Sequence, residues 1–196
     1  AHLFGDGWRF TNTGTITGDA YGVRIEGNDG TAINNGEILA LSRSDAVVGM
    51  EVVGDNNLII NTNGIAAGSG PYDADGPIEG APFDAFFPIG LSVEGDNNQI
   101  INRGDIYALG RGASAVTITG ADNSFVNYSD VGSLGEESIG INIVTTVSFG
   151  PDGSSFPDTV ATVENHGRVG GEAAAVRFGS VATQSHTLIN HEGALI

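Results

Sequence analysis

Short stretches of this chain alternate apolar and polar residues, and the same stretch recurs many times. Each copy begins with a small residue and continues with an apolar residue, a residue of any kind and a second apolar residue. The copies lie at 22–25, 49–52, 90–93, 115–118, 140–143 and 175–178. Alternation with a period of two is typical of a β-strand with one buried face. Each copy therefore predicts a short strand that points two apolar side chains into a core.

A second repeat accompanies these strands and consists of a Gly, six residues of any kind and an Asn. Its copies at 54–61 and 95–102 are nearly identical, with the sequences GDNNLIIN and GDNNQIIN. Two more Asn continue the series, whose members are Asn12, Asn34, Asn61, Asn102, Asn127, Asn165 and Asn190. Successive Asn lie 22, 27, 41, 25, 38 and 25 residues apart. The basic period is therefore 22 to 27 residues, and the two long intervals carry insertions at 68–88 and 145–158.

Another apolar residue follows each Asn after four positions and predicts a third strand in every period. The series is Ile16, Ile38, Ile65, Ile106, Val131 and Val169, whereas the last copy has Ala194. The turn between these strands has, two positions after the Asn, the residues Gly14, Gly36, Asn63, Gly104, Ser129, Gly167 and Glu192. Gly and Asn enter the left-handed backbone region at low cost, so we expect a left-handed residue at this turn.

Three short strands in each period predict an all-β protein, a single right-handed parallel β-solenoid of about seven coils. One coil cannot bury its apolar face alone, so coils stack about 4.8 Å apart and bring identical residues above one another. The seven Asn are then expected to form a hydrogen-bonded ladder. Residues 1–196 form one domain in this prediction, and the two insertions project as loops from its flank.

The residues just before the ladder Asn leave a question about the second strand of each coil. They include Ile33, Ile60, Ile101, Val126 and Ile189. Strict alternation would point them to solvent as an aliphatic stripe, whereas a bend at the corner would turn them into the core with their neighbours. Large apolar stripes are uncommon on soluble monomers, so we expect the bend.

The repeats resemble those of a known family. The strings that carry the likeness are TNTGTITG (11–18), INNGEILA (33–40), GDNNLIINTNGI (54–65) and GDNNQIINRGDI (95–106). They resemble right-handed parallel β-helix surface proteins, especially autotransporter passenger regions and haemagglutinin-like adhesins, over nearly the whole chain outside the insertions. The resemblance implies a secreted or surface-exposed protein, extracellular or at the cell surface, that serves adhesion or surface structure.

The charge of the chain excludes several classes of function. It has 24 acidic residues and 7 basic ones, all of them Arg, which gives a formal net charge of −17. A phosphate backbone would repel such a chain, so we expect no nucleic-acid partner. The chain has no Cys, which excludes disulfides and thiolate chemistry. The sequence contains no run of about 18 apolar residues, so we expect no membrane span.

The two inserted loops carry aromatic residues and are the candidate contact sites. These residues are Tyr72, Phe83, Phe86, Phe87, Phe149 and Phe156. In one hypothesis they pack on the flank of the solenoid, and in the others they contact another protein or stack on a sugar. The sequence Asp73-x-Asp75-Gly76 matches only the start of a calcium loop. We therefore expect no cofactor, with calcium as the alternative.

Stacking also predicts columns of charged and aromatic side chains. One column, directly after the ladder, contains Arg103, Tyr128, His166 and His191. Two histidines one coil apart suit a two-ligand metal site or a pH-sensitive pair, but we favour stacked, solvent-facing rings and assign no metal. The next column contains Asp105, Asp130 and Arg168, which we expect to form a surface ion ladder. The sequence lacks the signatures of pectin-degrading solenoids, so no catalytic residue is assigned.

Neither end of the predicted solenoid carries a capping pattern, because the sequence starts in a first strand and stops in a third. We expect either an excised segment of a longer passenger or a subunit whose open ends pair with copies of itself. The residues at such a junction are Ala1, His2, Leu3, Phe4, Gly193, Ala194, Leu195 and Ile196.

The leading functional prediction is a non-enzymatic extracellular structural protein that assembles head to tail into a surface or matrix fibre, with copies of itself as partners. The alternative is a carbohydrate- or host-binding adhesin that contacts surface glycans through the loop at 68–88. A polysaccharide-active enzyme is the third hypothesis.

Overall fold

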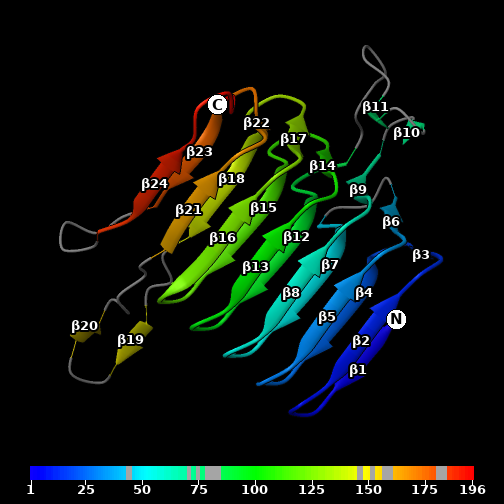
Figure 1. Ribbon diagram of the computed structural model, residues 1–196, viewed down its shortest axis with the longest axis vertical. Coiled ribbons are helices and arrows are strands. Elements are labelled where there is room, and N and C mark those ends of the chain that lie inside the picture. Colours follow the sequence, from blue (N-terminus) through cyan, green and yellow to red (C-terminus); the bar gives the residue numbers. More distant parts are fainter. Residues whose placement is uncertain are drawn as a thin grey trace.

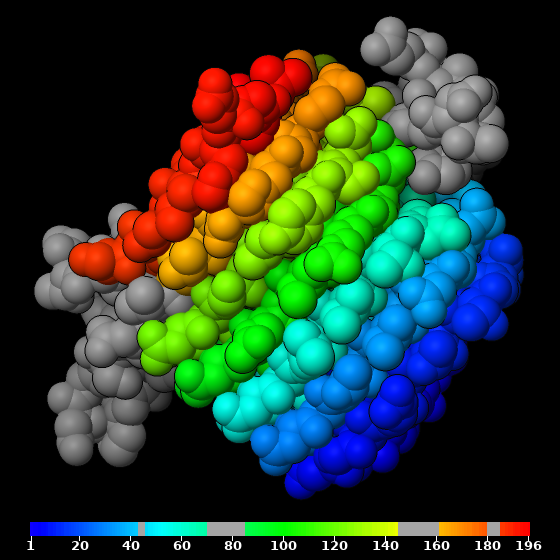
Figure 2. All heavy atoms as spheres, viewed as in Figure 1, coloured from blue at the N-terminus to red at the C-terminus, as the bar shows by residue number. Residues whose placement is uncertain are grey.

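Three parallel β-sheets run along the molecule, and each turn of the chain adds one strand to each sheet in succession (Figure 1). The computed structural model describes residues 1–42, 46–69, 72–73, 76–77, 85–144, 148–150, 153–155, 161–179 and 185–196; in the short stretches at 72–77 and 148–155 it describes the backbone alone. No residue in these ranges is helical. The coils form parallel bands from one end of the molecule to the other (Figure 2).

The three sheets are named A, B and C in the order in which the chain enters them. Sheet A contains β1 (His2–Phe4), β4 (Tyr21–Glu26), β7 (Val48–Val53), β12 (Ile89–Glu94), β15 (Ser114–Thr119), β18 (Ile139–Val144) and β23 (Ala174–Phe178). Sheet B contains β2 (Arg9–Asn12), β5 (Thr31–Asn34), β8 (Leu58–Asn61), β13 (Gln99–Asn102), β16 (Asn123–Asn127), β21 (Ala161–Asn165) and β24 (Thr187–Asn190). Sheet C contains β3 (Thr15–Gly18), β6 (Glu37–Leu41), β9 (Ile65–Gly68), β14 (Ile106–Leu109), β17 (Asp130–Leu134) and β22 (Arg168–Gly170).

Each insertion contains a small antiparallel pair outside these sheets. One pair is β10 (Tyr72–Asp73) with β11 (Gly76–Pro77), and the other is β19 (Ser148–Gly150) with β20 (Gly153–Ser155). Because the insertions leave the coil and return to it, the strands on either side of them keep the register of the stack. The predicted right-handed parallel β-solenoid of about seven coils is therefore confirmed.

The core lies between the three sheets and is built from aligned columns of apolar side chains. In sheet A one column runs through Val23, Met50, Leu91, Val116 and Ile141, all fully buried. The apolar residues four positions after each ladder Asn also face this core. Of the six from Ile16 to Val169, five are buried, and Ile16 of the first coil is half-buried. Alternation in the sequence thus identified the inward positions correctly.

The bend that we expected in sheet B is wrong, because its strands keep strict alternation up to the corner. The side chains of Ile33, Ile60 and Ile101 point outward and are half-buried, while their neighbours on both sides are buried. The reason is the ladder Asn, which takes the inward position at the corner and leaves the preceding residue outside. Aligned aliphatic side chains then cover one another along the axis, which limits their contact with water.

The left-handed turn that we expected after the ladder is also wrong. None of the seven residues two positions after a ladder Asn has a positive φ; left-handed residues occur at the opposite corner, for example Asn56 (φ 58°) and Asn97 (φ 57°). The glycines after the ladder have another cause. A Cβ at Gly36 would lie 2.0 Å from the main-chain oxygen of Gly14, so the close approach of stacked turns leaves no room for a side chain.

Phe125 provides a test of the inward alignment. It is fully buried in β16 between two coils, whereas Val126 on the same strand points outward. We expect Phe125→Ala to lower the free energy of unfolding by about 3–5 kcal/mol, because it leaves a cavity in the core. Val126→Ala is the matched control and should cost below about 1 kcal/mol in the same urea titration. Equal losses in both variants would contradict the assigned orientation.

Candidate functional site

The seven predicted ladder residues lie in one column and form an unbroken chain of hydrogen bonds. In every step the Nδ2 of one Asn donates to the Oδ1 of the Asn in the next coil, at 2.8–2.9 Å. The first six side chains are buried, and Asn190 in the last coil is exposed. All donors face one end of the solenoid and all acceptors face the other, so the ladder has a direction.

The ladder carboxamides of Asn12, Asn127 and Asn165 also contact the turn that follows them. The Oδ1 of Asn127 accepts a second bond from the main-chain N–H of Ser129 at 3.2 Å, and its Nδ2 donates to the Ser129 carbonyl at 2.7 Å. Asn165 makes the same pair of contacts with Gly167 at 3.2 Å. Only a group with both N–H donors and a carbonyl acceptor can meet these demands while it stacks on copies of itself.

The opposite corner contains a second ladder that our sequence analysis missed. The Oδ1 atoms of Asn57, Asn98 and Asn123 are buried and accept main-chain N–H groups of Gly30, Asn57 and Asn98, one coil away, at 2.8–2.9 Å. An exposed series at the same corner joins Asp6, Asn28, Asp55 and Asp96 in the same manner. The signal was present in the repeated GDNN string, whose second and fourth residues are the ones that form these ladders.

Breaking the first ladder at its centre should destabilise the fold. Asn102→Leu removes the acceptor of Asn61 and the donor to Asn127, both buried. We expect the free energy of unfolding to fall by about 2 kcal/mol or more, since each buried polar group without a partner costs about 1–3 kcal/mol. The exposed Asn35→Ala, next to the ladder, should cost below about 1 kcal/mol. Urea titration of both variants measures these free energies of unfolding. An Asn102→Leu protein with the same free energy of unfolding as the parent would show that the ladder adds no stability.

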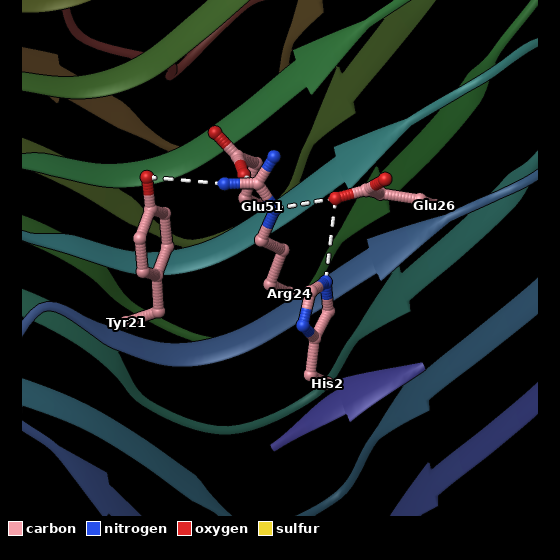
Figure 3. A network of polar contacts seen from close by, with 5 residues as sticks. All are labelled: His2, Tyr21, Arg24, Glu26 and Glu51. Atoms are coloured by element: carbon pink, nitrogen blue, oxygen red, sulfur yellow. Dashed lines mark hydrogen bonds and ion pairs between the residues drawn. The ribbon is translucent and has the colours of Figure 1, made fainter. Parts of the chain in front are cut away.

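A polar network covers the outer face of sheet A near the first coil (Figure 3). The Nε of Arg24 lies 2.7 Å from the Oε1 of Glu26 and 3.1 Å from the Oε2 of Glu51. The Nε2 of His2 lies 3.3 Å from the same Glu26 oxygen, and Arg24 also donates to the hydroxyl of Tyr21 at 3.4 Å. The network therefore links the first three strands of sheet A through their side chains.

The two carboxylates of this network have opposite pKa shifts. The hydrogen bond from Arg24 lowers the pKa of Glu26. Burial raises the pKa of Glu51, and the nearby Arg24 only partly opposes that effect. Charged Glu51 is thus less stable in the folded protein than in water, so its ionisation reduces stability as the pH rises from its ordinary pKa towards the raised value.

Replacing Glu51 by Gln should therefore stabilise the protein at neutral pH. We expect Glu51→Gln to have a higher Tm than the parent at pH 7, because the ionisation penalty is gone. The gain should disappear near pH 3, where Glu51 is protonated in the folded and unfolded states alike, since an unperturbed Glu has a pKa of about 4.3. Thermal unfolding at both pH values measures this difference. The exposed Glu172→Gln is the control, and a lower Tm of Glu51→Gln at pH 7 would contradict the argument.

The predicted contact residues of the loops are only partly described. Phe86 and Phe87 are 45% and 62% exposed, and Phe86 pairs with Arg111 through its backbone. Phe87 borders an open groove of about 540 Å³ on the outer face of sheet A, which also contains Glu137 and Arg177. The remaining contact residues lie outside the described side chains, as does the calcium-loop fragment; they are Tyr72, Phe83, Phe149 and Phe156.

The column after the ladder is a stack of rings. The rings of His166 and His191 lie 3.7 Å apart with 13° between their planes, and Tyr128 stacks on the other face of His166 at 4.7 Å. The guanidinium of Arg103 lies 5.5 Å from the Tyr128 ring centre. The two neighbouring rings cover both faces of His166, so a ligand can reach this ring only at its edge. Sequence analysis missed Glu164, whose Oε1 lies 2.8 Å from the Nε2 of both histidines.

The neighbouring acidic column has the contacts of a surface ladder. Asp105 accepts a hydrogen bond from the Ser129 hydroxyl at 2.7 Å, and Arg168 lies 3.6 Å from Asp130. The Arg168 side chain is largely exposed, so this ion pair lies in water. Asp130 and Arg168 thus form the ion pair expected from the spacing, whereas Asp105 accepts hydrogen bonds from Ser129 and from the Asp130 main chain.

The residues expected at the two ends lie on the first and last coils. His2–Phe4 form β1, and the N-terminal amine donates to the Gly22 carbonyl at 2.7 Å. In the last coil, Leu195 pairs with Arg168 through an isolated bridge in place of a further strand of sheet C. Phe4, Leu195 and Ile196 are 67%, 59% and 51% exposed. The predicted residues therefore form two separate surfaces, one on each end coil.

Comparison of the chain with protein-family models, with curated proteins and with solved structures finds no match. The fold itself defines the class of protein, a parallel β-solenoid built from stacked coils of three strands. Within the described part of the chain, no helix is long and apolar enough to cross a membrane.

Proposed function

We propose that this chain is a structural element of an extracellular or cell-surface fibre, in which the last coil of one copy stacks on the first coil of the next. The observation that carries the proposal is the direction of the Asn ladder, which gives the first and last described coils complementary hydrogen-bonding groups. The resemblance of the repeats to surface proteins with β-helices gives the expected location.

The edges of the end coils support stacking because they offer unpaired main-chain groups. Strands β1, β2 and β3 each have a neighbouring strand on one side only, and so do β23 and β24, whereas Leu195 already pairs with the outer side of β22. Such edges are templates for pairing with another strand. The last coil also leaves apolar interior positions uncovered: Leu188, which continues the buried column of Val163, is 40% exposed. A further coil on this face would bury that surface.

The ladder supports a head-to-tail arrangement and disfavours a head-to-head one. Asn190 donates one Nδ2 hydrogen to the Ala194 carbonyl, which leaves its second hydrogen facing the next coil position. Asn12 accepts a bond from Gly14 and has a further lone pair directed away from Asn34. A head-to-tail junction brings this donor to this acceptor, whereas a two-fold junction would oppose two donors or two acceptors. Such a translational contact does not close and produces a filament.

The charge of the chain limits the conditions under which copies associate. Each copy carries a formal charge of −17, so two copies repel one another at low ionic strength. Salt screens this repulsion within about 10 Å at 0.1 M. Filament formation should therefore be favoured by added salt or by divalent cations.

Two substitutions on one strand test the junction. Leu188 and Ile189 are 40% and 41% exposed on β24, but Leu188 faces the interior of the coil and Ile189 faces outward. We expect the parent protein and Ile189→Lys to form filaments with an axial repeat of about 34 Å, seven spacings of about 4.8 Å. Leu188→Lys places a charge inside the junction and should abolish them.

Negative-stain electron microscopy and light scattering at increasing salt measure this outcome. Both variants add one positive charge at neighbouring positions, so a difference between them reports on the junction and not on net charge. Dispersed monomers of the parent under all conditions would overturn the fibre proposal.

A second candidate function, an adhesin, is favoured by the exposed Phe86 and Phe87 beside the groove on sheet A. Exposed aromatic rings and a charged groove suit binding of a sugar or a host surface. Phe87→Ala should then reduce binding on a glycan array while the oligomeric state stays the same. No difference from the parent on the array would leave the fibre as the function supported here.

A further inference from the structure

Glu164, His166 and His191 form a cluster on the outer surface where the last two coils meet. Glu164 points outward from β21, and His166 directly follows the ladder Asn165 at the end of this strand, with its Nε2 2.8 Å from the Glu164 Oε1. His191 follows the next ladder Asn and lies one coil away. The three potential ligand atoms all lie within 4.8 Å of one another.

Contacts around the cluster hold the two imidazoles in one orientation. Their rings are stacked at 3.7 Å, Tyr128 covers the far face of His166, and both Nε2 atoms point at the same Glu164 oxygen. The side chains of His166, His191 and Glu164 are 29%, 40% and 32% exposed, so an ion from solvent can reach them. The ligand atoms are thus gathered before any ion arrives.

The donor set favours one class of ion. Two imidazole nitrogens with one carboxylate oxygen are typical ligands of Zn²⁺ and related transition metals, whereas Ca²⁺ and Mg²⁺ prefer oxygen ligands alone. Zn–N and Zn–O distances are about 2.0–2.2 Å, so small side-chain rotations allow all three atoms to reach one ion. Water would complete the coordination.

We propose that Glu164, His166 and His191 form a binding site for a divalent transition metal, with Zn²⁺ as the reference ion, that joins the last coil to the one before it. His191 directly follows β24, and all four residues of that strand are exposed. An ion that binds only the folded arrangement stabilises it in proportion to its occupancy. The site thus acts as a metal-dependent clamp on the terminal coil, independently of whether copies of the chain assemble.

Isothermal titration of the chelator-treated full chain with ZnCl₂ tests the site. We expect one ion per chain and a rise in Tm with Zn²⁺ that equal concentrations of CaCl₂ do not produce. His191→Ala should weaken binding by more than about tenfold, a loss that even the outer hydrogen-bond partners of metal ligands can cause. His2→Ala is the matched control, because His2 also contacts a glutamate but has no second histidine beside it.

Two further measurements separate loss of the site from loss of the fold. Glu164→Gln keeps a side chain of the same shape and should also weaken Zn²⁺ binding, while its circular dichroism spectrum stays that of the parent. Long-range ¹H–¹⁵N NMR should show Zn²⁺-induced shifts of the Nε2 resonances of His166 and His191 only. Absence of binding in the millimolar range, or equal affinity of the parent and His191→Ala, would overturn the proposal.

Discussion

Main-chain hydrogen bonds between successive coils are the interaction on which this molecule depends. These bonds place each residue next to the equivalent residue of the next coil. The residues of one column therefore have to pack favourably against one another. Apolar columns meet this demand by packing, as in the column from Val23 to Ile141. In the first ladder the stacked polar group has to donate to one neighbour and accept from the other, which a carboxamide does. In the second ladder the buried Oδ1 atoms accept main-chain N–H groups, while the Nδ2 atoms of Asn57 and Asn98 have no hydrogen-bond partner.

The same constraint explains the surface of the solenoid. Like charges stacked at the spacing between strands repel, and the described columns avoid this by alternation or by hydrogen bonds. Arg24 lies between carboxylates, and Asp55 and Asp96 accept main-chain N–H groups. A net charge of −17 repels other copies of the chain at low ionic strength, and added salt screens that repulsion.

The direction of the ladder connects the fold with the functions proposed for it. Aligned carboxamides give the two end coils different surfaces, a donor at Asn190 and an acceptor at Asn12. The coil that carries the donor adds no strand to sheet C, and the histidine pair with Glu164 lies at its junction with the preceding coil. Metal binding at this cluster would stabilise the last coil. It would thereby influence any contact made at that end of the solenoid.

Spacing along the sequence determined the fold class, the strand positions, the inward columns and the membership of the Asn ladder, because period and alternation are properties of the chain itself. The tertiary structure decided which features of different coils come together. The outward orientation of Ile33, Ile60 and Ile101 follows from the demand of the ladder for the inward corner. Glu164 joined the histidine pair because its side chain reaches across two coils, and glycine at position 36 follows from the approach of stacked turns. The orientation of these Ile is the one that strict alternation along the strand gives. The contacts of Glu164 and of Gly36 depend on distances between residues far apart in the sequence, which no local pattern encodes.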